Sequence, residues 1–344
     1  MKLQVHGLVR VFTEGEIKDA RKLGGLLSLD LELTKRCNLK CIYCYADGRR
    51  PRPNELSLDE IYGALDMARR LGAKKVTFTG GEPLTHKHFF DIAEYVHEAG
   101  LQILLYTNGT LIDSKVAEKL AEIGVFPCVK LDAVQADIQD TLAGVNGAFE
   151  SIMKGIDHLL EAGYGTKYQM NINTVICRIN IESLPQVWKW ARGKNIQPSF
   201  LRLGPKGRAL RSDLAVKTSE LKELFEELSR IDRDFGEDWR PTTPFCGRGC
   251  NKQYISCYVS SNGIVQPCTG VDIPAGNIRE ESLENILASS EVFKIARNME
   301  KYIKGACSTC EHLHKCYGCR GLAFYLNGDF TGADPLCWNN PEAI

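Results

Sequence analysis

The chain has 344 residues, enough for about two domains, and an apolar fraction of 44% that is ordinary for a globular protein. Its 43 basic and 43 acidic residues cancel, so bulk charge does not hold it to nucleic acid or to an anionic membrane. No apolar run is long enough to span a membrane, and the first residues lack the apolar core of a signal peptide. We expect a cytoplasmic protein.

Strand-like and helical segments alternate between residues 27 and 235. One helix is predicted to begin at Ser57, where Glu60 completes a capping box, and others are expected near 88–99, 114–123, 148–162, 181–192 and 218–231. Six such units predict an α/β fold with a parallel sheet, and six are too few for a closed eight-stranded barrel, so we expect an open, partial (βα)6 barrel. The six apolar runs that predict its strands are 26–33, 74–80, 101–107, 126–132, 167–176 and 198–204.

The chain changes character after Pro241. Helical periodicity fades, glycine and cysteine become frequent, and a hairpin is expected around Asn262-Gly263. This tail has too little apolar core to fold unaided, and bound metal clusters would supply the missing stability. We therefore predict a short N-terminal extension, a partial barrel and a cysteine-rich domain over residues 1–26, 27–235 and 240–344.

Fourteen cysteines are unusual in a chain without a secretion signal. Cys128 and Cys177 lie in apolar strand-like runs and are expected in the core. The others have the spacing of metal ligands. Cys37, Cys41 and Cys44 form a CX3CX2C loop directly after the first strand, and three thiolates would leave one iron of a four-iron, four-sulfur cluster open.

This loop resembles that of the radical S-adenosylmethionine (SAM) superfamily. The resemblance rests on CNLKCIYC at 37–44, GGEP at 80–83 and TNG at 107–109, in this order at successive strand ends. It implies that SAM chelates the open iron. It also implies that Tyr43 lies beside the adenine, that the GGEP turn receives the methionine ammonium, and that the next motif binds the ribose; the residues concerned are Gly80, Gly81, Glu82, Thr107 and Asn108.

Three further polar positions are compared with this family. Asn173, near Asn171 in the fifth strand, resembles a SAM-contacting position, although a strand-end asparagine fits equally. Asp132 stands where relatives have Asp-Gly, and Ala143-Gly144 where they have Arg-Gly. We predict that Asp132 is catalytic, orienting the substrate or taking a proton; the alternative is a solvated aspartate at a strand end.

The C-terminal cysteines resemble the SPASM extension of radical SAM enzymes. The spacing fits the family pattern, except that two residues rather than three separate Cys316 from Cys319. The resemblance implies two auxiliary four-iron clusters. The distal cluster would be held by Cys307, Cys310, Cys316 and Cys337, and the proximal one by Cys250, Cys268, Cys319 and either Cys257 or Cys246.

The choice between Cys257 and Cys246 depends on the hairpin. A two-residue turn would place Cys257 directly opposite Cys268, on the same face, which favours Cys257. A bulged turn would break this register and favour Cys246. A zinc ribbon that includes His312 and His314 is the alternative to iron–sulfur clusters, although its cysteine pairs would be unusually close in sequence.

The resemblance implies an enzyme that reductively cleaves SAM to a 5′-deoxyadenosyl radical, which abstracts a substrate hydrogen. We predict a peptide or protein substrate, because an extended peptide can pair with the exposed strand edge of an open barrel. The alternative substrate is a small molecule such as a sugar or tetrapyrrole precursor. Expected partners are flavodoxin or ferredoxin as electron donor and a separate peptide-binding chaperone. An iron–sulfur electron carrier without catalysis is the competing class.

Overall fold

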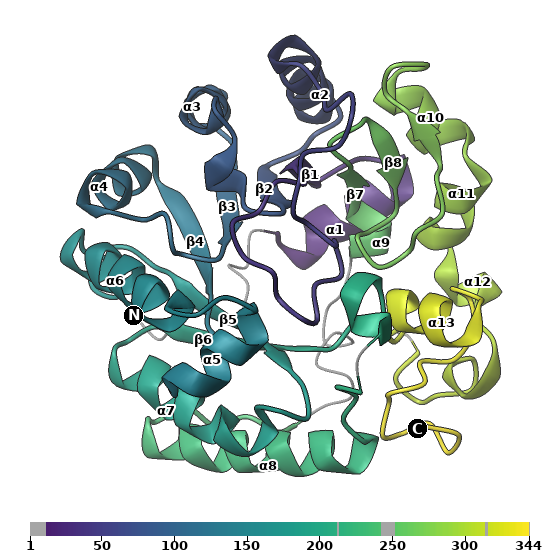
Figure 1. Cartoon of the computed structure of the whole chain (residues 1–344). Helices are drawn as coiled ribbons and strands as arrows, with labels where there is room; N and C mark the ends of the chain where they lie inside the picture. The colour runs from purple at the N-terminus through teal and green to yellow at the C-terminus, as the bar shows by residue number, and fades with distance from the viewer. Residues whose placement is uncertain (1–11, 212, 242–251, 314–315, 344) are drawn as a thin grey trace. The chain divides into compact units, whose positions relative to one another are not determined.

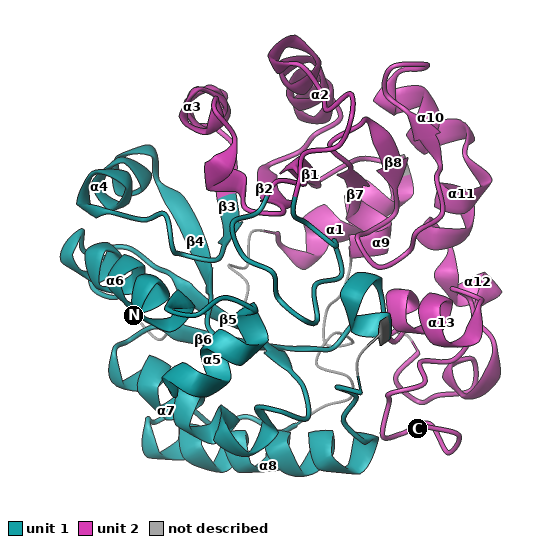
Figure 2. Ribbon diagram, in the orientation of Figure 1, with its two compact units in different colours: residues 1–9, 37–49, 104–241 teal, residues 10–36, 50–103, 242–344 magenta. Residues whose placement is uncertain are grey.

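The computed structural model describes residues 12–211, 213–241, 252–313 and 316–343. The chain divides into two compact units, drawn in different colours in Figure 2. Unit 1 consists of residues 1–9, 37–49 and 104–241, and unit 2 of residues 10–36, 50–103 and 242–344. Strand β3 (Gln102–Thr107) begins in unit 2 and continues into unit 1. The C-terminal region therefore shares a unit with the first two strands of the chain.

Unit 1 is a layered α/β unit in which strands β3, β4, β5 and β6 are neighbours in this order. β4 and β5 are parallel, with Cys128 opposite Asn171, and β5 and β6 continue in the same sense. Helices lie along the outside of these strands (Figure 1). The elements are α4 (Ser114–Ile123), β4 (Val125–Lys130), α5 (Ala136–Ala143), α6 (Ala148–Glu161), β5 (Asn171–Ile176), η2 (Ile181–Ser183), α7 (Leu184–Gly193), β6 (Gln197–Arg202), η3 (Gly207–Arg211) and α8 (Thr218–Asp234).

Unit 2 contains a sheet in the order β2-β1-β7-β8-β9. β1 is buried along its whole length and pairs in parallel with both β2 and β7, whereas β8 and β9 are antiparallel additions. The N-terminal elements are α1 (Glu14–Leu23), β1 (Ser28–Thr34), α2 (Leu58–Arg70), β2 (Lys75–Gly80), η1 (Pro83–Thr85) and α3 (Phe89–Glu98). The C-terminal ones are α9 (Lys252–Ile255), β7 (Ser256–Val259), β8 (Ile264–Gln266), β9 (Gly276–Asn277), α10 (Leu283–Ser289), α11 (Glu291–Arg297), α12 (Met299–Tyr302), η4 (Gly305–Cys307) and α13 (Arg320–Asn327).

The predicted α/β class is confirmed, and all six predicted strands are present. The capping box of α2 is also confirmed, since the Ser57 hydroxyl accepts from Glu60 N while the Glu60 carboxylate accepts from Ser57 N. The fifth strand begins at Asn171 rather than at residue 167. The preceding residues form a turn instead, because Gly163 and Gly165 both have positive φ and Gly165 N bonds to Tyr168 O.

Helical periodicity fades in the sequence after Pro241, yet the described part of this region contains short helices. α10, α11, α12 and α13 span only four to eight residues each, too few for a periodic pattern to emerge. Part of the C-terminal region shares a core with the N-terminal segment: Phe12 and, from α1, Ile17 and Ala20 pack with a group that includes Tyr254, Met299 and Phe330. The tail thus obtains apolar core from the segment that the sequence predicted to be a mere extension.

Cys128 and Cys177 are buried as expected. Within the described residues, no helix has the length and apolar character needed to cross a membrane.

Candidate active site

The cysteine loop at 37–44 lies in unit 1 and docks on the end of α5. Two backbone amides of the loop donate to helix carbonyls, Lys40 N to Ala143 O at 3.0 Å and Ile42 N to Leu142 O at 3.0 Å. Gly144 ends this helix with φ of 65°, and a Cβ there would lie 2.5 Å from Lys40 O. Only glycine combines this left-handed conformation with such a close approach. Gly144 stands at the glycine of the family's Arg-Gly, and the close approach of Lys40 O explains why this position has no side chain.

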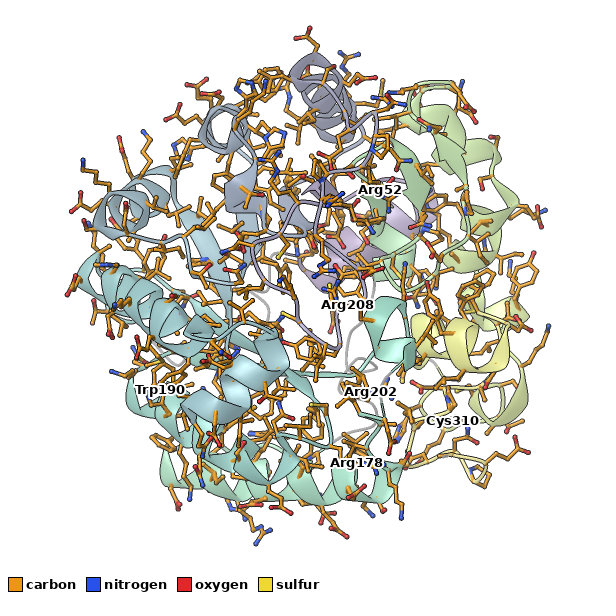
Figure 3. All side chains as sticks on the ribbon, in the orientation of Figure 1. Arg52, Arg178, Trp190, Arg202, Arg208 and Cys310 are labelled. Atoms are coloured by element: carbon orange, nitrogen blue, oxygen red, sulfur yellow. The ribbon has the colours of Figure 1, made fainter. Side chains whose placement is uncertain are left out.

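A second segment of unit 1, the 3-10 helix η3, holds the other end of the loop. Arg208 Nε donates to Cys41 O at 2.8 Å, and Arg208 N donates to Cys44 O at 3.0 Å. The same guanidinium forms an ion pair with Asp47 at 2.7 Å. Gly207 has φ of 61° and would place a Cβ 2.5 Å from Cys44 O. Arg208, labelled in Figure 3, thus bonds the backbone of two of the three cysteines.

Tyr43, a residue of this loop, forms a buried pair with Asp132. The Tyr43 hydroxyl donates to Asp132 Oδ2, and Lys130 Nζ lies 4.7 Å from the centroid of the Tyr43 ring. Burial, and then the negative charge of Asp132, hold the pKa of Tyr43 well above its usual range. Tyr43 is therefore a neutral donor, anchored by its hydroxyl. Because Tyr43 directly precedes Cys44, its hydrogen bond to Asp132 also holds this part of the loop in place.

Asp132 is buried and hydrogen-bonded to its own protein. Its side chain is 0% exposed, and Oδ1 accepts from Lys130 Nζ at 2.5 Å and from Val175 N at 2.9 Å. Its own N donates to the Gln139 side chain at 2.7 Å. Asp132 is therefore not the solvated aspartate of the alternative. Its catalytic role stays a prediction.

The three thiols of the loop have the character needed for an iron–sulfur cluster. Cys37, Cys41 and Cys44 are partly exposed thiols. Burial, followed by the charge of Asp132 and then the other two thiols, raises the pKa of Cys41 to about 12. The thiol is therefore protonated in the absence of metal, and a bound iron centre would supply the charge that removes its proton. Thiolates are the usual ligands of such clusters, so the donor set fits.

The TNG motif at 107–109 forms hydrogen bonds to the cysteine loop and to its own neighbouring residues. Asn108 Nδ2 donates to Asn38 Oδ1 at 2.8 Å and lies 3.9 Å from Cys37 Sγ, while its Oδ1 accepts from Thr110 N at 3.0 Å. Thr107 Oγ1 accepts from Gly109 N at 3.0 Å. The motif is thus a third support for the cysteine loop. The ribose contacts expected of Thr107 and Asn108 stay a prediction.

The GGEP turn lies in unit 2, against the end of β1. Cβ atoms on Gly80 and Gly81 would lie 2.3 Å from Thr34 O and 2.1 Å from Arg36 O, so both glycines make room for the chain's own carbonyls. Gly81 N and Glu82 N donate to the same two carbonyls. The Glu82 side chain is 0% exposed and caps η1 by accepting from Leu84 N at 3.1 Å. The contact with the methionine ammonium that is expected of this turn stays a prediction.

Asn171 and Asn173 lie in β5 of unit 1. Both side chains are buried, and as alternate residues they lie on one face of the strand. Asn171 Oδ1 has no hydrogen-bond partner among the described residues. The SAM contact predicted for Asn173 is not tested by this geometry.

Three of the four predicted distal ligands lie together in unit 2. The charges of Cys337 and Cys307 add to burial in raising the pKa of Cys316 to about 11. Backbone N–H groups donate to two of these sulfurs at 3.4 Å, from Gly318 to Cys316 and from Asp334 to Cys307. Hydrogen bonds to sulfur are typical of cluster ligands. Cys310 follows in the same region (Figure 3), and its Sγ accepts from His312 N at 3.5 Å.

The other predicted ligands are placed less completely. Cys268 and Cys319 are described and partly exposed, whereas Cys246 and Cys250 lie outside the described residues. His314, considered as a zinc ligand, also lies outside them, and His312 lies at the surface beside Glu311. Over the part of the chain that is described, no three His, Cys, Asp or Glu side chains converge on a single metal ion.

The β7–β8 hairpin differs from the expected one by one residue. Tyr258 pairs with Gln266 and Val259 with Val265, and Ser260 N bonds to Ile264 O at 2.9 Å. The loop therefore has three residues, with Gly263 at φ of 87°, rather than two. Continued, this register places Cys257 opposite Pro267, so Cys257 and Cys268 point to opposite faces. The expected register is wrong, and the argument that favoured Cys257 as a ligand is lost.

Sequence reasoning missed the residues that hold the cysteine loop from outside the motifs. Arg208 and Gly207 contact the loop, but neither stands in a recognisable pattern. Gly144 was noticed only beside Ala143, which replaces the arginine of the family's Arg-Gly. The one local signal was the pair of glycines flanking Pro-Lys at 204–207, which resembles any turn.

Residues 31–191 match the radical SAM superfamily, and residues 250–311 match the SPASM iron–sulfur cluster-binding domain. The chain is 32% identical to the AdoMet-dependent heme synthase of Oleidesulfovibrio alaskensis over 90% of this chain and 87% of that protein. It is 27% identical to the mycofactocin maturase MftC of Mycolicibacterium smegmatis, over 93% and 86%. Its fold is similar to that of Streptococcus suis SuiB, solved with the precursor peptide SuiA, with a TM-score of 0.75, 18% identity, and 93% and 78% of the two chains covered. The chain therefore belongs to the radical SAM superfamily and carries a C-terminal SPASM domain.

Proposed function

We propose that the chain is a radical SAM enzyme whose first iron–sulfur cluster is held by Cys37, Cys41 and Cys44. The observation that carries this proposal is the loop itself, which is hydrogen-bonded by α5, η3 and the TNG motif at Asn38, Lys40, Cys41, Ile42 and Cys44. When bound, the cluster and SAM supply reductive cleavage to methionine and a 5′-deoxyadenosyl radical. The chain's own part is to keep three thiols in one geometry and to orient SAM. The residues proposed for SAM are Tyr43, Gly80, Gly81, Glu82, Thr107, Asn108 and Asn173.

We propose a tetrapyrrole precursor as the substrate, from which hydrogen is abstracted at carbon. The support is the similarity to the AdoMet-dependent heme synthase, at 32% identity over nine-tenths of this chain. This choice takes up the small-molecule alternative that the sequence left open.

A peptide or protein residue is the second candidate. It is supported by the similarity to the mycofactocin maturase and by the fold shared with SuiB, a protein solved with its precursor peptide. In that case a separate peptide-binding chaperone would be a partner. For either substrate, the proposed electron donor is a flavodoxin or ferredoxin in the cytoplasm.

The SPASM domain is proposed to hold two auxiliary four-iron clusters. Three loaded clusters would bring the iron content to about 12 atoms per chain. The distal cluster is supported by the gathered thiols of Cys307, Cys316 and Cys337.

The experiment incubates anaerobically reconstituted enzyme with SAM, dithionite and either a panel of tetrapyrrole precursors or a set of small peptides. We expect 5′-deoxyadenosine to form in step with a mass change in a tetrapyrrole. The variant with Cys37, Cys41 and Cys44 all changed to alanine should lose about four iron atoms and all SAM cleavage. Cleavage that persists in this variant overturns the enzyme proposal. A mass change confined to peptides transfers the substrate assignment to the second candidate.

A further inference from the structure

Arg320, the first residue of α13, is a buried cation whose hydrogen bonding is incomplete. Arg320 is 4% exposed, and its Nη1 donates to Phe330 O at 3.0 Å and to Gly332 O at 2.6 Å. Nε and Nη2 are buried and have no hydrogen-bond partner among the described residues. Nη2 packs against Gly318, where a Cβ would lie only 2.9 Å away. Burying a guanidinium with two unmet donors is costly, so an anionic acceptor belongs beside it.

The Asp334 carboxylate lies on this side of Arg320, with Oδ2 3.2 Å from the position of the absent Gly318 Cβ, but that oxygen already accepts from Cys319 N at 2.6 Å. A second anionic group that the chain could hold here is a cluster at the predicted distal site. Gly318, whose absent Cβ would lie 2.9 Å from Arg320 Nη2, donates from its own N to Cys316 Sγ at 3.4 Å. Asp334, on the same side of Gly318, donates from its N to Cys307 Sγ at 3.4 Å. A cluster held by four thiolates is an anion with several sulfur acceptors, which is the partner that the two remaining donors of Arg320 lack.

We propose that Arg320 donates from Nε and Nη2 to sulfur atoms of the distal auxiliary cluster and thereby stabilises its reduced form. The inference rests on the proposed assignment of Cys307, Cys310, Cys316 and Cys337 to one cluster. Reduction by one electron adds one negative charge to the cluster. A buried positive charge that hydrogen-bonds its sulfurs favours that state and raises its reduction potential. Arg320 is thus a positioning and potential-setting residue, and it does not contact the substrate.

The test measures the potential directly. In the background that lacks Cys37, Cys41 and Cys44, the remaining iron–sulfur signals are titrated with dithionite and followed by electron paramagnetic resonance. The signal that an added Cys307→Ser change removes belongs to the distal cluster. We expect Arg320→Gln to shift its midpoint to a more negative potential with iron content unchanged. Arg320→Lys should shift it less, because an ammonium keeps the charge but loses the planar fork. The control Arg279→Gln removes a cation that pairs with Glu60 and should leave the midpoint unchanged.

The inference is overturned if the midpoint potential of the distal cluster is the same with Arg320→Gln as without it. If the glutamine variant loses iron, the lysine variant decides: a lowered midpoint supports the inference and an unchanged one overturns it. If no signal depends on Cys307, the assignment of the distal cluster fails and the inference fails with it. Loss of SAM cleavage in the parent enzyme is a separate measurement, so failure of the radical SAM proposal remains distinguishable.

Discussion

Tyr43 and Asp132, 89 positions apart in sequence, are joined by a buried hydrogen bond from the tyrosine hydroxyl to Oδ2 of the carboxylate. The second carboxylate oxygen accepts from Lys130 Nζ and from Val175 N. Asp132 therefore connects the residue beside the last cluster cysteine to the ends of β4 and β5. Its role is to hold the loop in place through Tyr43, which a carboxylate can do without touching the substrate.

This role predicts the effect of Asp132→Asn. The change removes the charge that pairs with Lys130 and with the Tyr43 hydroxyl, and charged hydrogen bonds contribute about 1.5–3 kcal/mol each. We expect the free energy of unfolding to fall by a similar amount, with faster loss of iron from the loop. Urea denaturation and iron analysis measure both. Tyr43→Phe, which keeps the ring, should reproduce part of the effect. Normal stability and iron content with turnover abolished would instead return Asp132 to a catalytic role.

Arg208 gives a second prediction for the same loop. Arg208→Gln removes the donor to Cys41 O and the ion pair with Asp47. The cluster proposed on Cys37, Cys41 and Cys44 should therefore lose iron to a chelator several-fold faster. The matched control is Arg178→Gln, also labelled in Figure 3, whose side chain is 59% exposed and pairs with the exposed Asp213. Exposed pairs contribute little, so this control should behave as the unchanged protein. Equal iron loss in both variants would show that Arg208 does not hold the loop.

The positions of the motifs could be predicted from the sequence because each lies at a strand end, and strands are short, local, apolar patterns. The partners of these motifs could not. Arg208 is 167 positions from Cys41, and Gly144 approaches Lys40 through a helix end, so no local pattern connects them. Only the folded chain brings these residues together.

The hairpin shows a subtler failure. Asn-Gly favours a two-residue turn when both residues take positive φ, but here only Gly263 does. The Asn262 side chain instead accepts from Ser260 Oγ at 2.8 Å and from Arg52 at 3.1 Å. Arg52 is 210 positions away. A long-range contact to the side chain of a turn residue thus accompanies a three-residue loop, and it moves the register by one.

Gly144 and Gly147 form a matched pair for a third prediction. Both have positive φ, at 65° and 76°, but a Cβ on Gly144 would meet Lys40 O at 2.5 Å whereas one on Gly147 would meet nothing within 4 Å. Alanine at either position should lower the free energy of unfolding by about 1–2 kcal/mol, because a residue with a Cβ is strained in the left-handed conformation. Gly144→Ala should additionally displace the cysteine loop and lower its iron occupancy. Iron occupancy that falls equally in both variants would contradict the proposed docking of the loop on α5.

The last prediction concerns the thiol that completes the proximal cluster. Cys257 is 0% exposed in β7, opposite Leu29 of β1, and burial raises the pKa of its thiol well above the usual range. With the observed three-residue loop it faces away from Cys268, so the alternative ligand is Cys246, which lies outside the described residues. We expect Cys246→Ala to remove about four of about 12 iron atoms and Cys257→Ala to remove none. Cys128→Ala, another buried strand thiol, controls for the general cost of a small core cavity. Iron analysis after anaerobic reconstitution decides between them, and loss of iron from the Cys257 variant with full retention in the Cys246 variant would restore Cys257 as the ligand.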